Sequence, residues 1–254
     1  MKHQERAHSK FSASGAERRF NCPGSVALSE GIPDKQTEWS REGTQAHEVL
    51  EETLKYSITP PKNKFTARNI ARVNSSITQF RPKTMVIHAV HAANFILNLY
   101  TKLQDSEILI ENKVHLTFIH PEMFGTYDGA VVDHFGTLHV FDYKYGAGHA
   151  VSPKENLQMI FYGIGLANLY DWNFKRVRLW IIQPRIKGYD GPVFWELTIP
   201  ELKRYVEDFK KAVERVEVKP FDFQEGSWCH WCRAKTKCPL KEKTKLEHAK
   251  MIFK

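Results

Sequence analysis

Residues 125–146 read GTYDGAVVDHFGTLHVFDYKYG, and this stretch decides the fold. Apolar and polar residues alternate on both sides of Phe135–Gly136–Thr137, which is typical of two strands joined by a tight turn. A further alternating run, ILIENKVHLTFI, begins at residue 108 and precedes the hairpin. The pattern therefore predicts a three-stranded meander between about residues 107 and 145.

Segments with helical and strand periodicity surround this meander. Apolar residues recur at three- and four-residue spacing before and after it, and two more strand-like runs, RVRLWIIQP and PVFWELTI, lie further along the chain. We expect helices at 39–56, 85–103, 153–170 and 200–217. This order predicts an α/β fold in which one mixed sheet is flanked by helices.

The chain is long enough for one substantial domain. We interpret 1–254 as a single domain with a core at 39–217, an N-terminal segment at 11–38 and a cysteine-rich segment at 218–254. Within the N-terminal segment, SASGAERRFN predicts a short helix capped by Ser12 or Ser14, and a turn is expected at Pro23–Gly24.

Two carboxylates and a lysine are the most informative side chains of the hairpin. Asp142 and Lys144 are two residues apart in an extended strand, so both should project from one face, and the hairpin can bring Asp128 beside them. Asp133 is an odd number of residues from Asp128 and should face the other way. Converging carboxylates suit Mg²⁺ or Mn²⁺, and a neighbouring lysine can orient a water molecule. An exposed, purely structural ion pair is the alternative interpretation of the same residues.

The formal net charge of +8 is compatible with a basic face that binds a polyanion, or with a merely solvated surface. The opening residues MKHQERAHSK are charged and no apolar run follows them, which predicts a cytoplasmic protein without a secretory signal. No G-x-x-x-x-G-K-[ST] phosphate loop occurs in the sequence, so we expect no ATPase motor.

Four cysteines are unevenly placed. Cys229, Cys232 and Cys238 form a C-x2-C-x5-C pattern near the C-terminus, whereas Cys22 stands alone near the N-terminus. In a cytosolic chain such spacing favours metal binding over disulfides. Four thiolates suffice for a [4Fe–4S] cluster or for Zn²⁺.

The hairpin motifs resemble those of the RecB-like branch of the PD-(D/E)XK nucleases, in which G-x-x-D is followed by D-Y-K. GTQAHEVLEE at 43–52 resembles that family's first motif, and QMIFY at 158–162 matches its Q-x-x-x-Y motif. The resemblance implies a restriction-endonuclease-like core with a divalent metal held by His47, Asp128, Asp142 and the main-chain carbonyl of Tyr143. It further implies that Lys144 is catalytic, that Gln158 and Tyr162 bind DNA, and that Glu111 either supports the site or pairs with a lysine.

The cysteines resemble the iron–sulfur staple of AddB-type and CRISPR-adaptation nucleases, in which one cysteine precedes the nuclease motifs and three follow them. This resemblance implies a [4Fe–4S] cluster held by Cys22, Cys229, Cys232 and Cys238, with Zn²⁺ as the alternative.

The opening sequence also resembles a bacteriophage and prophage family of RecB-like exonucleases. We therefore expect a metal-dependent DNA exonuclease of recombination, replication or repair in the host cytoplasm, with a single-strand-annealing protein as one candidate partner. An endonuclease, a catalytically inactive DNA-binding module and a zinc-stabilised adaptor are the alternative interpretations.

Overall fold

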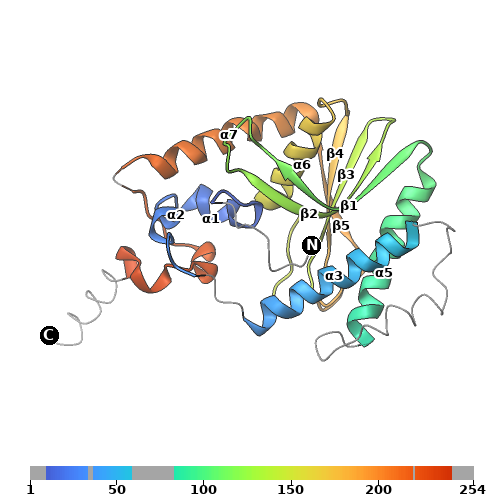
Figure 1. The fold of residues 1–254 in the computed structure, drawn as a ribbon, viewed down its shortest axis with the longest axis horizontal. Helices are drawn as coiled ribbons and strands as arrows, with labels where there is room; N and C mark the ends of the chain where they lie inside the picture. The colour runs from blue at the N-terminus through green and yellow to red at the C-terminus, as the bar shows by residue number, and fades with distance from the viewer. Residues whose placement is uncertain (1–9, 34–36, 59–82, 220, 242–254) are drawn as a thin grey trace.

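The computed structural model describes residues 10–33, 37–58, 83–219 and 221–241. A five-stranded sheet forms the centre of the molecule, with helices on both of its faces (Figure 1). The expected α/β class is thus confirmed. Within the described ranges, no helix combines the length and the apolar character needed to cross a lipid bilayer.

The strands lie in the sheet in the same order as in the sequence. The first three are antiparallel neighbours, the third and fourth are parallel, and the fifth is antiparallel to the fourth. Their bounds are β1 Ser106–His115, β2 Phe124–Asp133, β3 Thr137–Tyr143, β4 Arg176–Ile182 and β5 Val193–Thr198. The meander expected from the alternating pattern is β1–β2–β3.

The β2–β3 hairpin closes at Gly136, whose φ of 116° is a conformation that favours glycine. The side chain of Asp133 supports the turn by accepting a hydrogen bond from the amide of Phe135 at 3.0 Å. Gly129 pairs with Phe141 across the hairpin, which sets Asp128 beside Asp142. Strand β2 begins at Phe124, so Asp128 lies in its middle.

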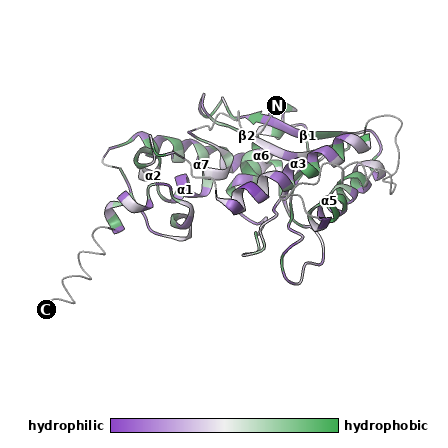
Figure 2. Cartoon of the chain, turned by 60° about the horizontal axis from the view of Figure 1, so that its bottom comes forward, coloured by the Kyte–Doolittle hydropathy of each residue, from purple (hydrophilic) through white to green (hydrophobic). Residues whose placement is uncertain are grey.

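Two long helices cover one face of the sheet. The first of these helices is α3 (Glu38–Ile58), and the second is α5 (Lys83–Lys102). They bury apolar side chains against Val131, Phe141 and Trp180. Figure 2 shows α5 largely in green, as expected of a helix with many buried apolar residues. Helix α3 starts one residue before and ends two residues after its predicted range, whereas α5 starts two residues before and ends one residue before its predicted range.

The opposite face is covered by α6 (Leu157–Leu169) and α7 (Ile199–Glu217). Helix α6 forms the crossover between the parallel strands β3 and β4. It begins at Leu157 rather than at the expected Pro153, because the Asn156 side chain accepts hydrogen bonds from two amides of the first turn and caps the helix there.

The N-terminal elements pack against α6 and α7 and against the C-terminal segment. They are η2 (Ala13–Gly15), α1 (Ala16–Asn21) and α2 (Gly24–Leu28), and the C-terminal elements are η3 (Ser227–Trp231) and η4 (Lys235–Lys237). The amide of Gly24 donates to the carbonyl of Asp222 at 2.8 Å, which joins the two ends of the described chain.

Two expectations for the N-terminal segment are wrong. Ser12 occupies the N-cap position of η2 but makes no capping hydrogen bond through its side chain, and Ser14 lies inside η2. The Pro23–Gly24 pair starts α2 instead of forming an isolated turn, since Pro23 has helical φ and ψ and can occupy the first position of a helix.

Candidate active site

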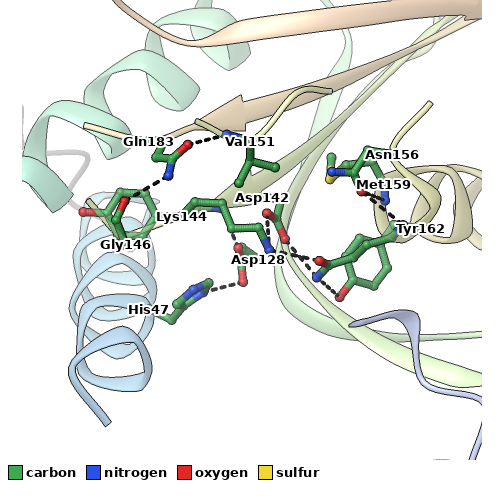
Figure 3. A network of polar contacts seen from close by, with 12 residues as sticks. His47, Asp128, Asp142, Lys144, Gly146, Val151, Asn156, Met159, Tyr162 and Gln183 are labelled. Carbon is green, nitrogen blue, oxygen red and sulfur yellow. Dashed lines mark hydrogen bonds and ion pairs between the residues drawn. The ribbon is translucent and has the colours of Figure 1, made fainter. Parts of the chain in front are cut away.

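His47 and Asp128 form the first polar pair of the candidate site. His47 projects from α3 toward Asp128 on β2, and its Nδ1 lies 2.8 Å from Asp128 Oδ1 (Figure 3). Burial lowers the pKa of His47, but the Asp128 carboxylate outweighs burial and raises this pKa above its ordinary value. The pair brings together two residues that are 81 positions apart in the sequence.

Asp142 and Lys144 form the second pair. The Lys144 Nζ lies 2.8 Å from Asp142 Oδ2, so the two side chains share a face of the hairpin, as the strand alternation predicts. Asp142 is buried, with a side-chain exposure of 4%, whereas that of Lys144 is 27%. Although Asp142 Oδ2 faces this ammonium group, it has no hydrogen bond of good geometry.

Helix α6 supplies an amide and a phenol to the same site. Gln158 Oε1 accepts a hydrogen bond from Lys144 Nζ at 2.9 Å, and Gln158 Nε2 donates to Asp142 Oδ1 at 3.2 Å. Gln158 Nε2 also lies 3.1 Å from the hydroxyl oxygen of Tyr162. Gln158 and Tyr162 lie one helical turn apart on one face of α6, and Gln158 contacts both Asp142 and Tyr162. Figure 3 shows Tyr162 near Asp142.

Tyr143 contributes main-chain and ring contacts. Its amide donates to Asp128 Oδ2 at 2.7 Å, so both oxygens of Asp128 are engaged by the protein. Its ring is fully buried and packs edge-on against the imidazole of His47, with 5.8 Å between the ring centroids. Tyr143 therefore fixes the orientation of both members of the first pair.

Glu111 lies on β1, next to the position of Asp128 on β2. The register pairs Ile110 with Gly129 and Asn112 with Tyr127, which leaves Glu111 opposite Asp128. Glu111 has a φ of 47°, a left-handed conformation that is unfavourable for a residue with a Cβ. Such strain is concentrated at functional sites in proteins. The alternating sequence of β1 carries no signal for it, because alternation predicts extended backbone throughout.

The two aspartates have opposite electrostatic environments. Burial raises the pKa of Asp128, but its contacts with His47 outweigh burial and the pKa is lowered. Burial also raises the pKa of Asp142, and there the nearby Asp128 charge adds to burial, so the pKa is raised despite Lys144. Burial and the Asp142 carboxylate together raise the pKa of Tyr162 well above its ordinary value. The site thus concentrates negative charge in a poorly hydrated place, which favours a cation.

The four cysteines line one pocket between the N-terminal and C-terminal segments. Cys22 follows α1 and is buried, whereas Cys229, Cys232 and Cys238 belong to the turns around η3 and η4 and are half-buried. Burial raises the pKa of the Cys22 thiol, while its hydrogen bond from the Gln224 amide opposes that rise. The ligand set implied by the resemblance requires Cys22 to lie near the other three cysteines, and the fold brings all four to the walls of this pocket.

Comparison with known proteins places the chain in a family. A family model described as "Protein of unknown function (DUF2800)" matches residues 8–254. The chain belongs to the DUF2800 family. The structure described as "Crystal structure of SSO0001" is similar over 79% of this chain and 98% of that chain, with 14% sequence identity and a TM-score of 0.35.

The side chains of the DUF2800 site have the donor chemistry of a hard divalent cation site: two carboxylates, an imidazole and the nearby Glu111. Asp142 Oδ2 is buried and is paired with the Lys144 ammonium group at 2.8 Å, a positive charge whose place a metal cation could take. In the arrangement seen, however, the residues pair with one another. Across the described part of the chain, no three His, Cys, Asp or Glu side chains are disposed so that they could hold a metal ion. Binding of a cation would therefore require His47 and Lys144 to turn away from their present partners.

Proposed function

We propose that this DUF2800 protein is a divalent-metal-dependent DNA nuclease of the RecB-like PD-(D/E)XK class, and that it hydrolyses DNA from its ends. The observation that carries the proposal is the contact of Lys144 with both Asp142 and Gln158, beside the His47–Asp128 pair. Four secondary-structure elements, namely α3, β2, β3 and α6, together with Lys144 just after β3, thus contribute residues of the four motifs to one place. A purely structural ion pair would need neither the helical histidine nor the amide from α6.

In this proposal Asp128, Asp142, His47 and the carbonyl of Tyr143 hold Mg²⁺ or Mn²⁺. The cation, when bound, supplies positive charge that polarises the scissile phosphate and stabilises the leaving oxygen. The chain's own residues orient the reactants. Lys144 donates hydrogen bonds through Nζ and is half-exposed, so it can hold the attacking water and share its charge with the phosphate.

Gln158 and Tyr162 have a second task in the proposed mechanism. Gln158 contacts both Lys144 and Asp142, so it fixes the distance between the ammonium group and the carboxylate. When Lys144 turns toward the water, Gln158 Oε1 loses this partner, and the amide can then rotate so that Nε2 donates to the phosphate backbone of DNA. The net charge of +8 favours this polyanionic substrate, because neutralising phosphates dominates binding to DNA.

We further propose that the four cysteines hold a [4Fe–4S] cluster that staples the N-terminal to the C-terminal segment. The pocket that all four line supports this ligand set. Since the cysteines, as placed in the described part of the chain, are not disposed to hold a metal ion, cluster binding would draw their side chains closer together. A thiol must lose its proton to bind a metal, and the raised pKa of Cys22 means that binding releases this proton. Protein purified without oxygen should be brown, with broad visible absorption and about four iron atoms per chain. A colourless protein that contains zinc would overturn the cluster and leave the nuclease proposal standing.

The nuclease proposal is tested with end-labelled linear DNA and covalently closed circular DNA, each in Mg²⁺, Mn²⁺ or EDTA. The wild type is compared with Lys144→Ala, Asp128→Ala and a control, Lys175→Ala, which removes an exposed lysine just before β4 at the far end of the sheet. We expect metal-dependent loss of linear DNA by the wild type and the control, and none by the two site variants. Cutting of closed circles would make the protein an endonuclease. An inactive wild type with its cluster intact would favour the DNA-binding module.

A further inference from the structure

One loop joins the two halves of the candidate site. It begins at Lys144, just after β3, and ends at Asn156, which caps the helix that carries Gln158. Residues 146–150 of this loop are exposed and their sequence is GAGHA, which has little side chain to pack. The position of Lys144 relative to Gln158 therefore depends on what holds the loop.

Gln183 holds this loop through three hydrogen bonds to its main chain. Its Nε2 donates to the carbonyls of Gly146 and His149, both at 2.9 Å, and its Oε1 accepts from the amide of Val151 at 2.8 Å. Figure 3 shows the contacts with Gly146 and Val151. Gln183 is buried, with 7% of its surface exposed. Both donor hydrogens and the acceptor of one buried primary amide are thus used on a single loop.

The position of Gln183 follows from the parallel pairing of β3 with β4. Tyr143 pairs with Ile182, and the amide of Lys144 donates to the Ile182 carbonyl at 2.9 Å. The residue after Ile182 therefore lies beside the start of the loop. A glutamine there reaches three main-chain groups of the loop, and these groups satisfy its buried side-chain amide, which would be unfavourable without partners.

We propose that Gln183 is a positioning residue of the nuclease site, which acts through the loop to fix the main chain at Lys144, so that the lysine side chain can reach its present partners Asp142 and Gln158 as well as the attacking water. This inference rests on the proposed function for its catalytic consequence, but not for the placement of the lysine. Gln183 itself touches neither carboxylate. Its contribution is to restrict the loop to one conformation before substrate binds, which is the condition for efficient catalysis by a positioned group.

Two variants of Gln183 and one control test the proposal. Gln183→Met keeps the volume but loses all three hydrogen bonds, and Gln183→Glu keeps the shape but turns a carboxylate oxygen toward two carbonyls. Val177→Ala is the control, because it removes buried methyl groups near the start of the same strand, away from the loop. We expect kcat to fall about tenfold or more in both Gln183 variants, with KM for DNA within about twofold, since a small displacement of a catalytic group reduces the rate steeply. In Val177→Ala, kcat should stay near the wild-type value.

The second readout does not need nuclease activity. Acetylation of Lys144 by limiting acetic anhydride, followed by peptide mass spectrometry, reports how firmly its amine is held. Relative to Lys175 in the same sample, acetylation of Lys144 should rise severalfold in either Gln183 variant and stay unchanged in Val177→Ala. If the wild type degrades no DNA, the proposed function fails, and the acetylation rates still decide whether Gln183 positions Lys144. Unchanged acetylation of Lys144 in both Gln183 variants would overturn the inference, as would wild-type kcat in an active enzyme.

Discussion

Gly165 marks the closest approach of α6 to the sheet and provides a quantitative test of the packing that places Gln158 and Tyr162. A Cβ at this position would lie deep inside van der Waals contact with Val114 Cγ2 and 2.9 Å from Leu116 Cδ1. Both neighbours are buried and belong to β1 or the residue after it. Gly165→Ala therefore forces α6 away from the sheet or strains both side chains.

Two opposing effects set the size of the change. Overpacking a well-packed core destabilises by about 1–3 kcal/mol. Replacing glycine by alanine within a helix gains about 1 kcal/mol. The difference is about 0–2 kcal/mol, and the severe contact with Val114 favours its upper end. We therefore expect Gly165→Ala to lower the free energy of unfolding by about 2 kcal/mol, which lowers Tm by a few degrees in a chain of this size.

Gly163, two residues earlier on α6, is the matched control. A Cβ there would lie 3.2 Å from Leu179 Cδ2, which is the end of a flexible side chain that can shift. Gly163→Ala should therefore be neutral or stabilising by up to about 1 kcal/mol. Urea unfolding followed by tryptophan fluorescence measures both variants. A Gly165→Ala protein at least as stable as the wild type would refute the close packing of α6, and Val114→Ala should partly restore stability if the clash is the cause.

Three further changes have definite expected results. His139 is buried and accepts a hydrogen bond from Trp180 Nε1, and burial, helped by Arg178, lowers the pKa of His139 to about 4. Because the unfolded chain binds this proton first as the pH falls, stability should decrease between about pH 6.5 and pH 4, by about 2 kcal/mol at pH 5. This loss should be absent from the pH profile of unfolding of His139→Phe. Asn156→Ala removes the cap of α6 and should destabilise by about 1 kcal/mol in thermal unfolding, whereas Asn156→Asp should retain most of that stability. Glu111→Gln should leave unfolding by urea within about 0.5 kcal/mol of wild type and reduce metal-dependent cleavage at least tenfold, and full activity would remove Glu111 from the site.

The sequence predicts those features that depend on periodicity. Alternation places Asp142 and Lys144 on one face of a strand, and their ion pair has the expected geometry. Three- and four-residue spacing locates the helix that carries His47, and the separation of Gln158 from Tyr162 places both on one side of α6.

Features that depend on tertiary contact were not predicted. The left-handed backbone of Glu111 arises inside a run that alternates regularly, so local sequence gives no sign of it. In the sequence, Gln183 is an ordinary polar residue after an apolar strand. Its contacts with the loop arise only because β3 and β4 pair in parallel in the folded protein. Pro23–Gly24 is a frequent turn sequence, but packing of the segment against α7 and the contact with Asp222 favour a helix.

The central claim is that Asp142 and its neighbours hold a divalent cation that is required for DNA cleavage. The most direct measurement is the initial rate of hydrolysis of end-labelled linear duplex DNA as a function of Mg²⁺ concentration, for the wild type and for Asp142→Asn. The asparagine keeps the shape and the hydrogen bond to Gln158 but removes the charge that faces Lys144. We predict a wild-type rate that rises with Mg²⁺ and saturates, and a variant rate at background at every concentration. A wild-type rate that is unaffected by Mg²⁺ and EDTA, or a variant as active as the wild type, would contradict the account.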